Sequence, residues 1–142
     1  MALLVAPLFP FALASLLGTL AWTDWRTKTV PDGLTLSLVA TGLANSWIAG
    51  ETFGATATLS LGLISLGLFQ ERVFAERGWF GSGDYFLFAG AIAWTGLLAI
   101  ADLLLLTSIF LGAHAIFARS TTIAMAPSLA AATLILFFGA PY

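Results

Sequence analysis

Cysteine is absent from this sequence, which excludes disulfides, thiolate zinc sites and cysteine-dependent catalysis. Charge is scarce as well: Asp, Glu, Lys and Arg make up only 8% of the 142 residues, and the formal net charge is -2. Five Lys and Arg residues are too few to follow a phosphate backbone, so nucleic acid is not an expected partner. His114 is the single histidine and is expected to contact a neighbouring helix, so neither a metal ion nor a cofactor is predicted.

Apolar side chains are abundant instead. They make up 60% of the sequence, with twelve Phe and five Trp, and the mean hydropathy is +1.01. A soluble core of this size could not bury so many, so the composition predicts an integral membrane protein. The apolar stretches predict an all-α bundle of about six transmembrane helices that forms one domain over residues 1–142. These stretches span residues 3–22, 34–49, 53–70, 84–101, 103–118 and 121–138.

The distribution of charge predicts how the bundle is oriented. If the helices alternate across a bilayer, every basic residue falls in the first, third or fifth connection. The basic residues are Arg26, Lys28, Arg72, Arg77 and Arg119. The connections on the other side carry Glu51 and Asp102 and no Lys or Arg. Since positive charge is enriched in cytoplasmic loops, we expect a multi-pass protein of the inner (cytoplasmic) membrane, surrounded by lipid, with both termini extracytoplasmic.

Two aspartates stand at the edges of apolar stretches. Asp24 follows the first stretch, and Asp84 begins the fourth, where it closes the sequence Gly81-Ser82-Gly83-Asp84. Ionisable groups at such places are costly and usually carry function. The predicted topology brings both to the cytoplasmic boundary, where one carboxyl could deprotonate water while the other protonates a carbonyl oxygen. The glycines of the connection 71–83 suit a gate that admits a peptide.

Three segments together resemble a known family. They are residues 24–35, residues 81–96 and residues 123–130, the last of which contains Pro127. In this order they resemble type IV prepilin peptidases, which are membrane aspartyl proteases of the Gly-X-Gly-Asp class. The resemblance covers about residues 20–132 and implies that Asp24 and Asp84 are the catalytic pair.

The resemblance also implies a substrate. It is a pilin-like precursor with a short basic N-terminal leader, a glycine before the cut and a hydrophobic helix after it. Gly81, Ser82, Gly83 and Pro127 are then expected to contribute to substrate binding. The filament system that is served and the oligomeric state are left open by the sequence.

The sequence departs from the family pattern in two ways. Phe86 stands where many members carry lysine, and that leaves the lysine's role unfilled. Larger members also carry an N-terminal cytoplasmic region with paired cysteines and N-methyltransferase activity, for which this sequence has no cysteine. We therefore expect a stand-alone peptidase, similar to those that serve Flp-type or archaeal-type filaments, without methylation of the new N-terminus.

Other interpretations of the same residues are weighed beside this one. Asp24 could simply end a helix and Asp84 could cap one, as is expected of Asp32. A small transporter or proton relay would place its acids near the bilayer midplane, where the predicted helices carry none. An intramembrane serine protease would use Ser82 and His114, and a non-catalytic pilus assembly subunit would use neither pair. Pro127 would either kink the last helix or lie at its start.

Overall fold

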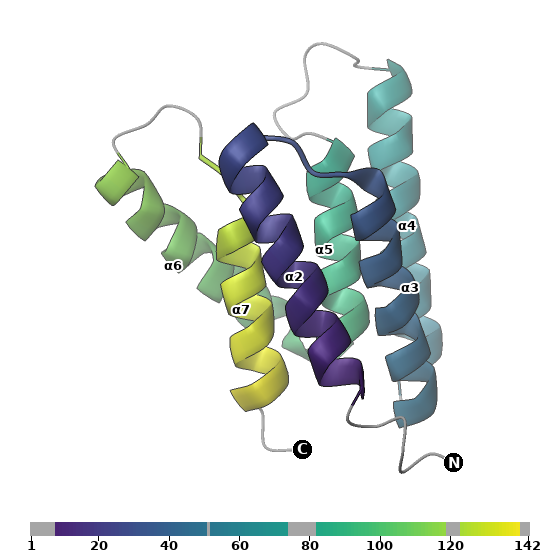
Figure 1. The fold of residues 1–142 in the computed structure, drawn as a ribbon. Helices are drawn as coiled ribbons and strands as arrows, with labels where there is room; N and C mark the ends of the chain where they lie inside the picture. Colours follow the sequence, from purple (N-terminus) through teal and green to yellow (C-terminus); the bar gives the residue numbers. More distant parts are fainter. Residues whose placement is uncertain (1–7, 51, 74–81, 119–122, 140–142) are drawn as a thin grey trace.

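The structure, a computed structural model, describes residues 8–50, 52–73, 82–118 and 123–139 (Figure 1). Within these ranges the regular elements are six α-helices and one 3₁₀ turn, which confirms the all-α class and the number of helices. The elements are α2 (Leu8–Thr27), α3 (Asp32–Ala49), α4 (Phe53–Val73), α5 (Ser82–Thr95), η1 (Leu97–Ala99), α6 (Ile100–Ala118) and α7 (Ala126–Gly139).

The lengths of the helices differ in a way that matters for a bilayer. Two helical segments of the described chain, Phe53–Val73 and Leu97–Phe117, are long and apolar enough to cross a membrane. Helices α5 and α7 have 14 residues each, which corresponds to about 21 Å of helix. That is shorter than the roughly 30 Å of hydrocarbon in a bilayer. The two long segments are consistent with a membrane protein, and six complete crossings remain a prediction.

The surface of the bundle is also consistent with lipid surroundings. Large apolar side chains are exposed on several helices, among them Phe11 (74%), Leu98 (88%) and Phe117 (87%). A soluble monomer rarely presents contiguous apolar surface of this kind to water.

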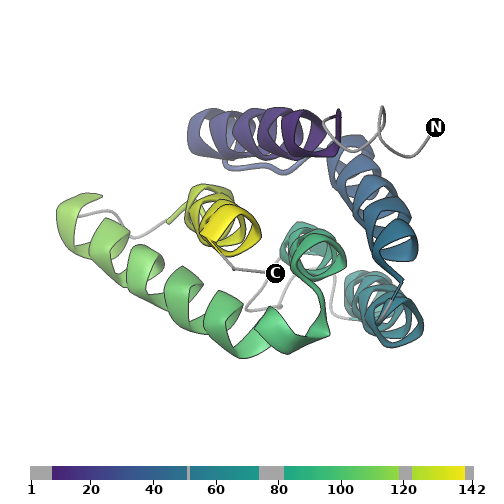
Figure 2. The same ribbon diagram turned by 90° about the horizontal axis from the view of Figure 1, so that it is seen from below.

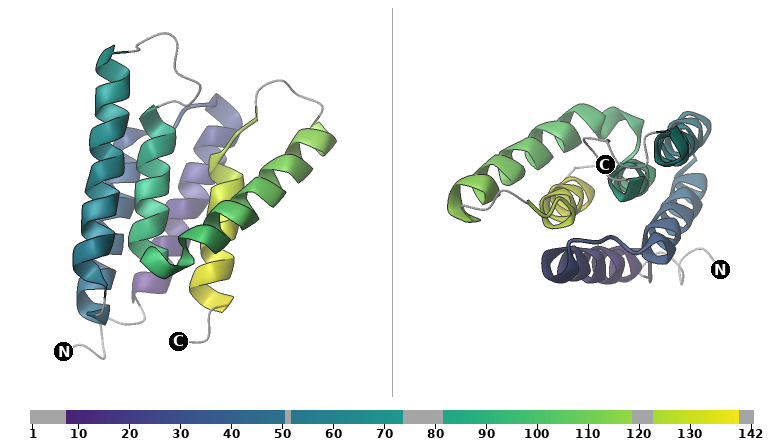
Figure 3. Two further views of the ribbon diagram at one scale, coloured as in Figure 1. Left: turned by 180° about the vertical axis from the view of Figure 1, so that it is seen from behind. Right: turned by 90° about the horizontal axis from the view of Figure 1, so that it is seen from above.

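The helices alternate in direction, and α2 begins at the end of the bundle where α7 finishes (Figure 1). Helix α5 packs against α3, α4 and α7, while α7 packs against α2, α5 and α6 (Figure 2). Helix α6 leans away from α4 and α5 and packs obliquely across α7 (Figure 3). The arrangement places α5 and α7 at the centre and leaves α6 at the margin.

Close contacts fix α5 against α3. A β-carbon on Gly42 would lie 2.7 Å from Trp94 Cδ1, and one on Gly90 would lie 2.6 Å from Leu38 Cδ2. The indole N–H of Trp94 donates a buried hydrogen bond of 2.9 Å to the carbonyl oxygen of Leu38. Small residues at these points let the two helix backbones approach, as is common between membrane helices.

Other contacts extend the core to the remaining helices. The Ser60 hydroxyl of α4 donates a hydrogen bond of 3.1 Å to the carbonyl oxygen of Ala89 in α5. On α2, the buried Leu13, Leu17 and Leu20 share one face and join the main apolar cluster. Helix α5 is therefore held by α3 on one side and by α4 on another.

Two predicted helix boundaries were wrong. The fourth helix ends at Thr95 rather than near residue 101, because Gly96 turns the chain with a φ of +80° before η1. Asp102 accordingly lies in the first turn of α6 and not in a connection. The last helix begins at Ala126 rather than at residue 121, so Pro127 is its second residue. Proline is tolerated there because the first N–H groups of a helix have no partner within the helix.

Candidate active site

Asp24 lies in the last turns of α2 with its side chain turned into the bundle. It is 6% exposed, whereas the next residues, Trp25 and Arg26, are exposed. The helix ends at Thr27, because Lys28 takes a left-handed conformation with a φ of 55° and its N–H donates to the carbonyl oxygen of Asp24 at 2.9 Å. This is a common way for a helix to terminate, although glycine usually occupies the left-handed position. The end of α2 thus leaves the Asp24 carboxyl inside the protein.

The Asp24 side chain contacts the beginning of α7. Its Oδ2 accepts a buried hydrogen bond of 2.9 Å from the backbone N–H of Ala126, the first residue of that helix. The first N–H groups of a helix lack intrahelical partners, and a carboxylate interacts favourably with the positive end of the helix dipole. Asp24 therefore stabilises the start of α7 instead of only ending its own helix.

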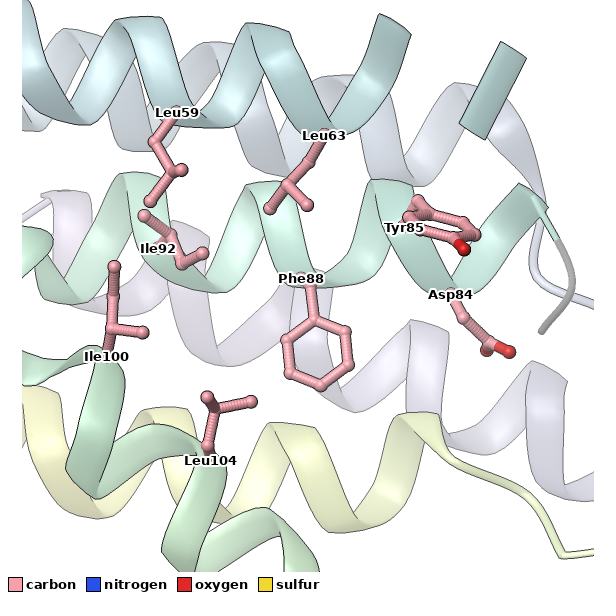
Figure 4. Close-up of a pocket in the computed structure, with 8 residues that line it drawn as sticks. All are labelled: Leu59, Leu63, Asp84, Tyr85, Phe88, Ile92, Ile100 and Leu104. Atoms are coloured by element: carbon pink, nitrogen blue, oxygen red, sulfur yellow. The ribbon is translucent and has the colours of Figure 1, made fainter. Parts of the chain in front are cut away.

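Asp84 is the third residue of α5 and is partly buried. Because α5 begins at Ser82, Asp84 lies within the first turn and not at the cap position. Its carboxyl group points away from the leucines of α4, on the same side of α5 as Phe88 (Figure 4). An acid in the first turn also interacts favourably with the helix dipole.

The two aspartate segments touch one another through Gly83 and Val30. A β-carbon on Gly83 would lie 3.2 Å from Val30 Cβ, so the first turn of α5 rests directly on the connection that follows α2. Helix α2 ends and α5 begins at the same end of the bundle (Figure 1). Since α7 packs against both, the structure brings the three segments of the family resemblance together. Gly81 lies outside the described residues.

Basic side chains gather at the same end of the bundle. Arg26 and Lys28 follow Asp24, and Arg72 lies in the last turn of α4. The Arg26 guanidinium lies 5.4 Å from the centre of the Trp22 ring, and the Lys28 ammonium lies 5.8 Å from that of the Trp25 ring. Tryptophan is enriched at membrane–water interfaces and Lys and Arg in cytoplasmic loops, so this grouping is consistent with a position near a membrane surface. Glu51, Glu76, Arg77 and Arg119 lie outside the described residues.

The positions of the other acids and of the histidine in the described ranges can be compared with what a transporter or a metal site would require. Asp32 and Asp102 lie in the first turns of α3 and α6, and Glu71 lies in the last turns of α4. None of these acids is near the middle of a helix, as a transporter would require. The His114 ring packs at 5.1 Å from the Trp25 ring. In the part of the chain that the structure describes, no three His, Asp or Glu side chains form a group that could hold a metal ion.

An apolar groove of about 340 Å³ begins beside Asp84 (Figure 4). Its lining comes from α4, α5 and α6 and consists of Leu59, Leu63, Asp84, Tyr85, Phe88, Ile92, Ile100 and Leu104. The groove is not predictable from the sequence, because it depends on the lean of α6. The sequence does contain one indication of the groove, because the paired apolar residues of its lining are four positions apart on each helix.

Comparisons with known proteins agree with the resemblance. A family model described as "Type IV leader peptidase family" matches residues 11–117, a range that contains both Asp24 and Asp84. The chain is 33% identical over 139 residues to the "Prepilin leader peptidase/N-methyltransferase" of Xanthomonas campestris pv. campestris. That match covers 89% of this chain and 48% of the relative, so the chain spans about half of the relative's length. No solved structure matches.

Proposed function

Because the chain belongs to the type IV leader peptidase family, we propose that it is a membrane-embedded aspartyl endopeptidase that removes the short leader from pilin-like precursors. Membership supports a leader-cleaving peptidase in general. The observation that carries the aspartyl assignment is the contact between the two aspartate segments, in which Gly83 rests on Val30.

The chemistry follows from what two carboxyl groups can do. One ionised carboxyl takes a proton from water as the water oxygen attacks the carbonyl carbon of the scissile amide. The other, protonated carboxyl donates its proton to the carbonyl oxygen, which gives a tetrahedral diol. The first carboxyl then passes its proton to the nitrogen as the C–N bond breaks, while the second takes a proton back from a hydroxyl of the diol. Asp24 and Asp84 are proposed for these two roles.

The proposed side of action is the cytoplasmic face of the inner membrane. Arg26, Lys28 and Arg72 lie at the same end of the bundle as Asp24 and Asp84. Positive charge of this kind is typical of the cytoplasmic side of a membrane protein. A precursor whose hydrophobic helix lies in the bilayer would present its leader junction at this level, with membrane lipid around both proteins. Gly81, Ser82, Gly83 and Pro127 are proposed to contact the precursor near the cut.

Methyl transfer is not part of the proposed activity. The printed name of the Xanthomonas relative includes an N-methyltransferase, but this sequence lacks the paired cysteines that the resemblance associates with that activity. We expect the mass of the new N-terminus to be the same with and without S-adenosylmethionine.

Cleavage of a defined precursor tests the proposal. The purified chain in lipid vesicles is mixed with a precursor that carries a basic leader, a glycine and an apolar helix, and the products are identified by mass spectrometry. We expect one cut directly after the glycine, and insensitivity to a fluorophosphonate that would label Ser82 in a serine protease. Failure to cut any such precursor would contradict the peptidase assignment and favour an assembly role.

A further inference from the structure

Six of the eight residues that line the groove form three matched pairs of side chains, and the other two are Asp84 and Tyr85. Each wall contributes two apolar residues four positions apart, which lie on the same face of a helix. The pairs are Leu59 and Leu63 of α4, Phe88 and Ile92 of α5, and Ile100 and Leu104 of α6. Asp84 precedes Phe88 by four residues and therefore continues the α5 row as its polar end (Figure 4). The groove thus runs along α5 and ends at a candidate catalytic acid.

The groove is open because α6 does not close it. Gly96 turns the chain sharply after α5, and α6 then packs obliquely across α7 (Figure 3). The chain itself covers little of α4 and α6: only 17% of an 18-residue apolar stretch in Phe53–Val73 and 11% of one in Leu97–Phe117 are buried. The volume of the groove, about 340 Å³, lies at the lower end of the range for ligand sites, roughly 300–1,000 Å³.

The length and the apolar lining of the groove indicate which kind of molecule it binds. The stretch of α5 from Asp84 to Ile92 is about 12 Å long at 1.5 Å per residue. The walls of the groove are helices, and their side chains form ridges into which those of another helix can pack. An apolar α-helix matches this length and spacing. The acyl chain of a phospholipid would also fit the apolar walls, but its anionic phosphate would then lie near the Asp84 carboxyl, where like charges repel.

We propose that this groove binds the first turns of the apolar helix that follows the scissile bond of the precursor, so that the bond itself lies at Asp84. The inference rests on the proposed peptidase function and adds to it the site that recognises the helix. Helices α4 and α6 contact the substrate helix from two sides, and α5 carries Asp84 at the end of the groove. The apolar helix is then a specificity element and not only a membrane anchor.

Neighbouring leucines on α6 provide a matched pair of variants. Leu104 lines the groove and is 48% exposed, whereas Leu105 lies outside the lining and is 60% exposed. Leu104→Trp fills part of the groove and should lower kcat/KM for the precursor about tenfold, mainly through KM, as expected when one apolar contact is lost. Leu105→Trp should leave kcat/KM unchanged. Equal effects of the two variants would overturn the proposal.

Cross-linking gives a second measurement that needs no turnover. Because the chain has no cysteine, Leu104→Cys and Leu105→Cys each introduce a single thiol. Each variant is mixed in vesicles with a set of precursors and then oxidised. Each precursor carries a single cysteine, at a different position in the first turns of its apolar helix. We expect disulfides to Leu104→Cys with a helical periodicity along the precursor, and none to Leu105→Cys.

The outcomes separate the two proposals. Normal cleavage without preferential cross-linking at position 104 would overturn the groove assignment and leave the peptidase function standing. Labelling of position 104 by a photoactivatable phospholipid in the presence of saturating precursor would also overturn it, because lipid would then be the occupant. Cross-linking at position 104 without cleavage by the unmodified chain would support the groove and contradict the peptidase function.

Discussion

The backbone N–H of Ala126 donates a hydrogen bond of 2.9 Å to Oδ2 of Asp24, across 102 positions of sequence. The bond joins the end of α2 to the start of α7 inside the protein, where water does not compete for either group. Asp24 therefore has a structural role that is separate from its proposed chemistry, and variants at this position should distinguish the two.

Asp24→Ala and Asp24→Asn should differ in stability. The alanine variant removes the acceptor and leaves the Ala126 N–H unpaired, which costs about 1–3 kcal/mol of the free energy of unfolding. The asparagine variant keeps an oxygen acceptor and should lose roughly half of that or less. Thermal unfolding in detergent measures the difference. Equal stability of the two Asp24 variants would show that the hydrogen bond contributes nothing.

Gly83→Ala should impair cleavage more than stability. The added β-carbon would lie 3.2 Å from Val30 Cβ, so α5 or the connection must shift by a few tenths of an ångström. A shift of this size beside a catalytic acid should reduce kcat/KM about tenfold. Gly54 is the matched control, since it is also the second residue of a helix but has nothing within 4 Å. The account predicts full activity for Gly54→Ala.

The contact between the two aspartate segments can be tested directly. The double variant Val30→Cys, Gly83→Cys should form a disulfide on mild oxidation, because its β-carbons would lie close to the separation of about 3.5–4.5 Å found in disulfides. The pair Val30→Cys, Gly54→Cys should not, since Gly54 is the second residue of α4, which begins at the other end of the bundle (Figure 1). Gel mobility before and after reduction measures both. A disulfide in the control pair alone would place the segments apart.

Gly42→Ala should destabilise the bundle. Its β-carbon would lie 2.7 Å from Trp94 Cδ1 and 2.8 Å from Ala93 Cβ, so α3 and α5 would be forced apart. Overpacking of this kind costs about 1–3 kcal/mol. Gly112→Ala, with nothing within 4 Å, should instead stabilise α6 by about 0.5–1 kcal/mol. Thermal unfolding of both variants checks the sign of each effect.

The sequence predicted at which end of the bundle the two aspartates lie, but not the contacts that surround them. Helix alternation and the positions of Arg26 and Arg72 were sufficient to place Asp24 and Asp84 at one end. The break at Gly96 was missed because the chain is apolar on both sides of it, so hydropathy gives no signal. A single glycine in such a run can equally serve helix packing, as Gly90 does.

Tertiary contacts account for what the sequence did not predict. The bond from Ala126 to Asp24 exists only because α7 starts against the end of α2, and no local pattern encodes that docking. The groove likewise depends on the lean of α6, which its packing on α7 determines. Sequence spacing identified the polar residues, whereas their partners depended on how the helices pack.

Single substitution of the two aspartates tests the central claim most directly. Asp24→Asn and Asp84→Asn preserve the size of each side chain but remove its acid–base chemistry, so each should reduce the rate of precursor cleavage by about 10³-fold or more. Asp102→Asn, in the first turn of α6, should cleave at the rate of the unmodified chain. Helical content and thermal unfolding in detergent confirm that each variant is folded. Cleavage at an undiminished rate by folded Asp24→Asn or Asp84→Asn would contradict the account.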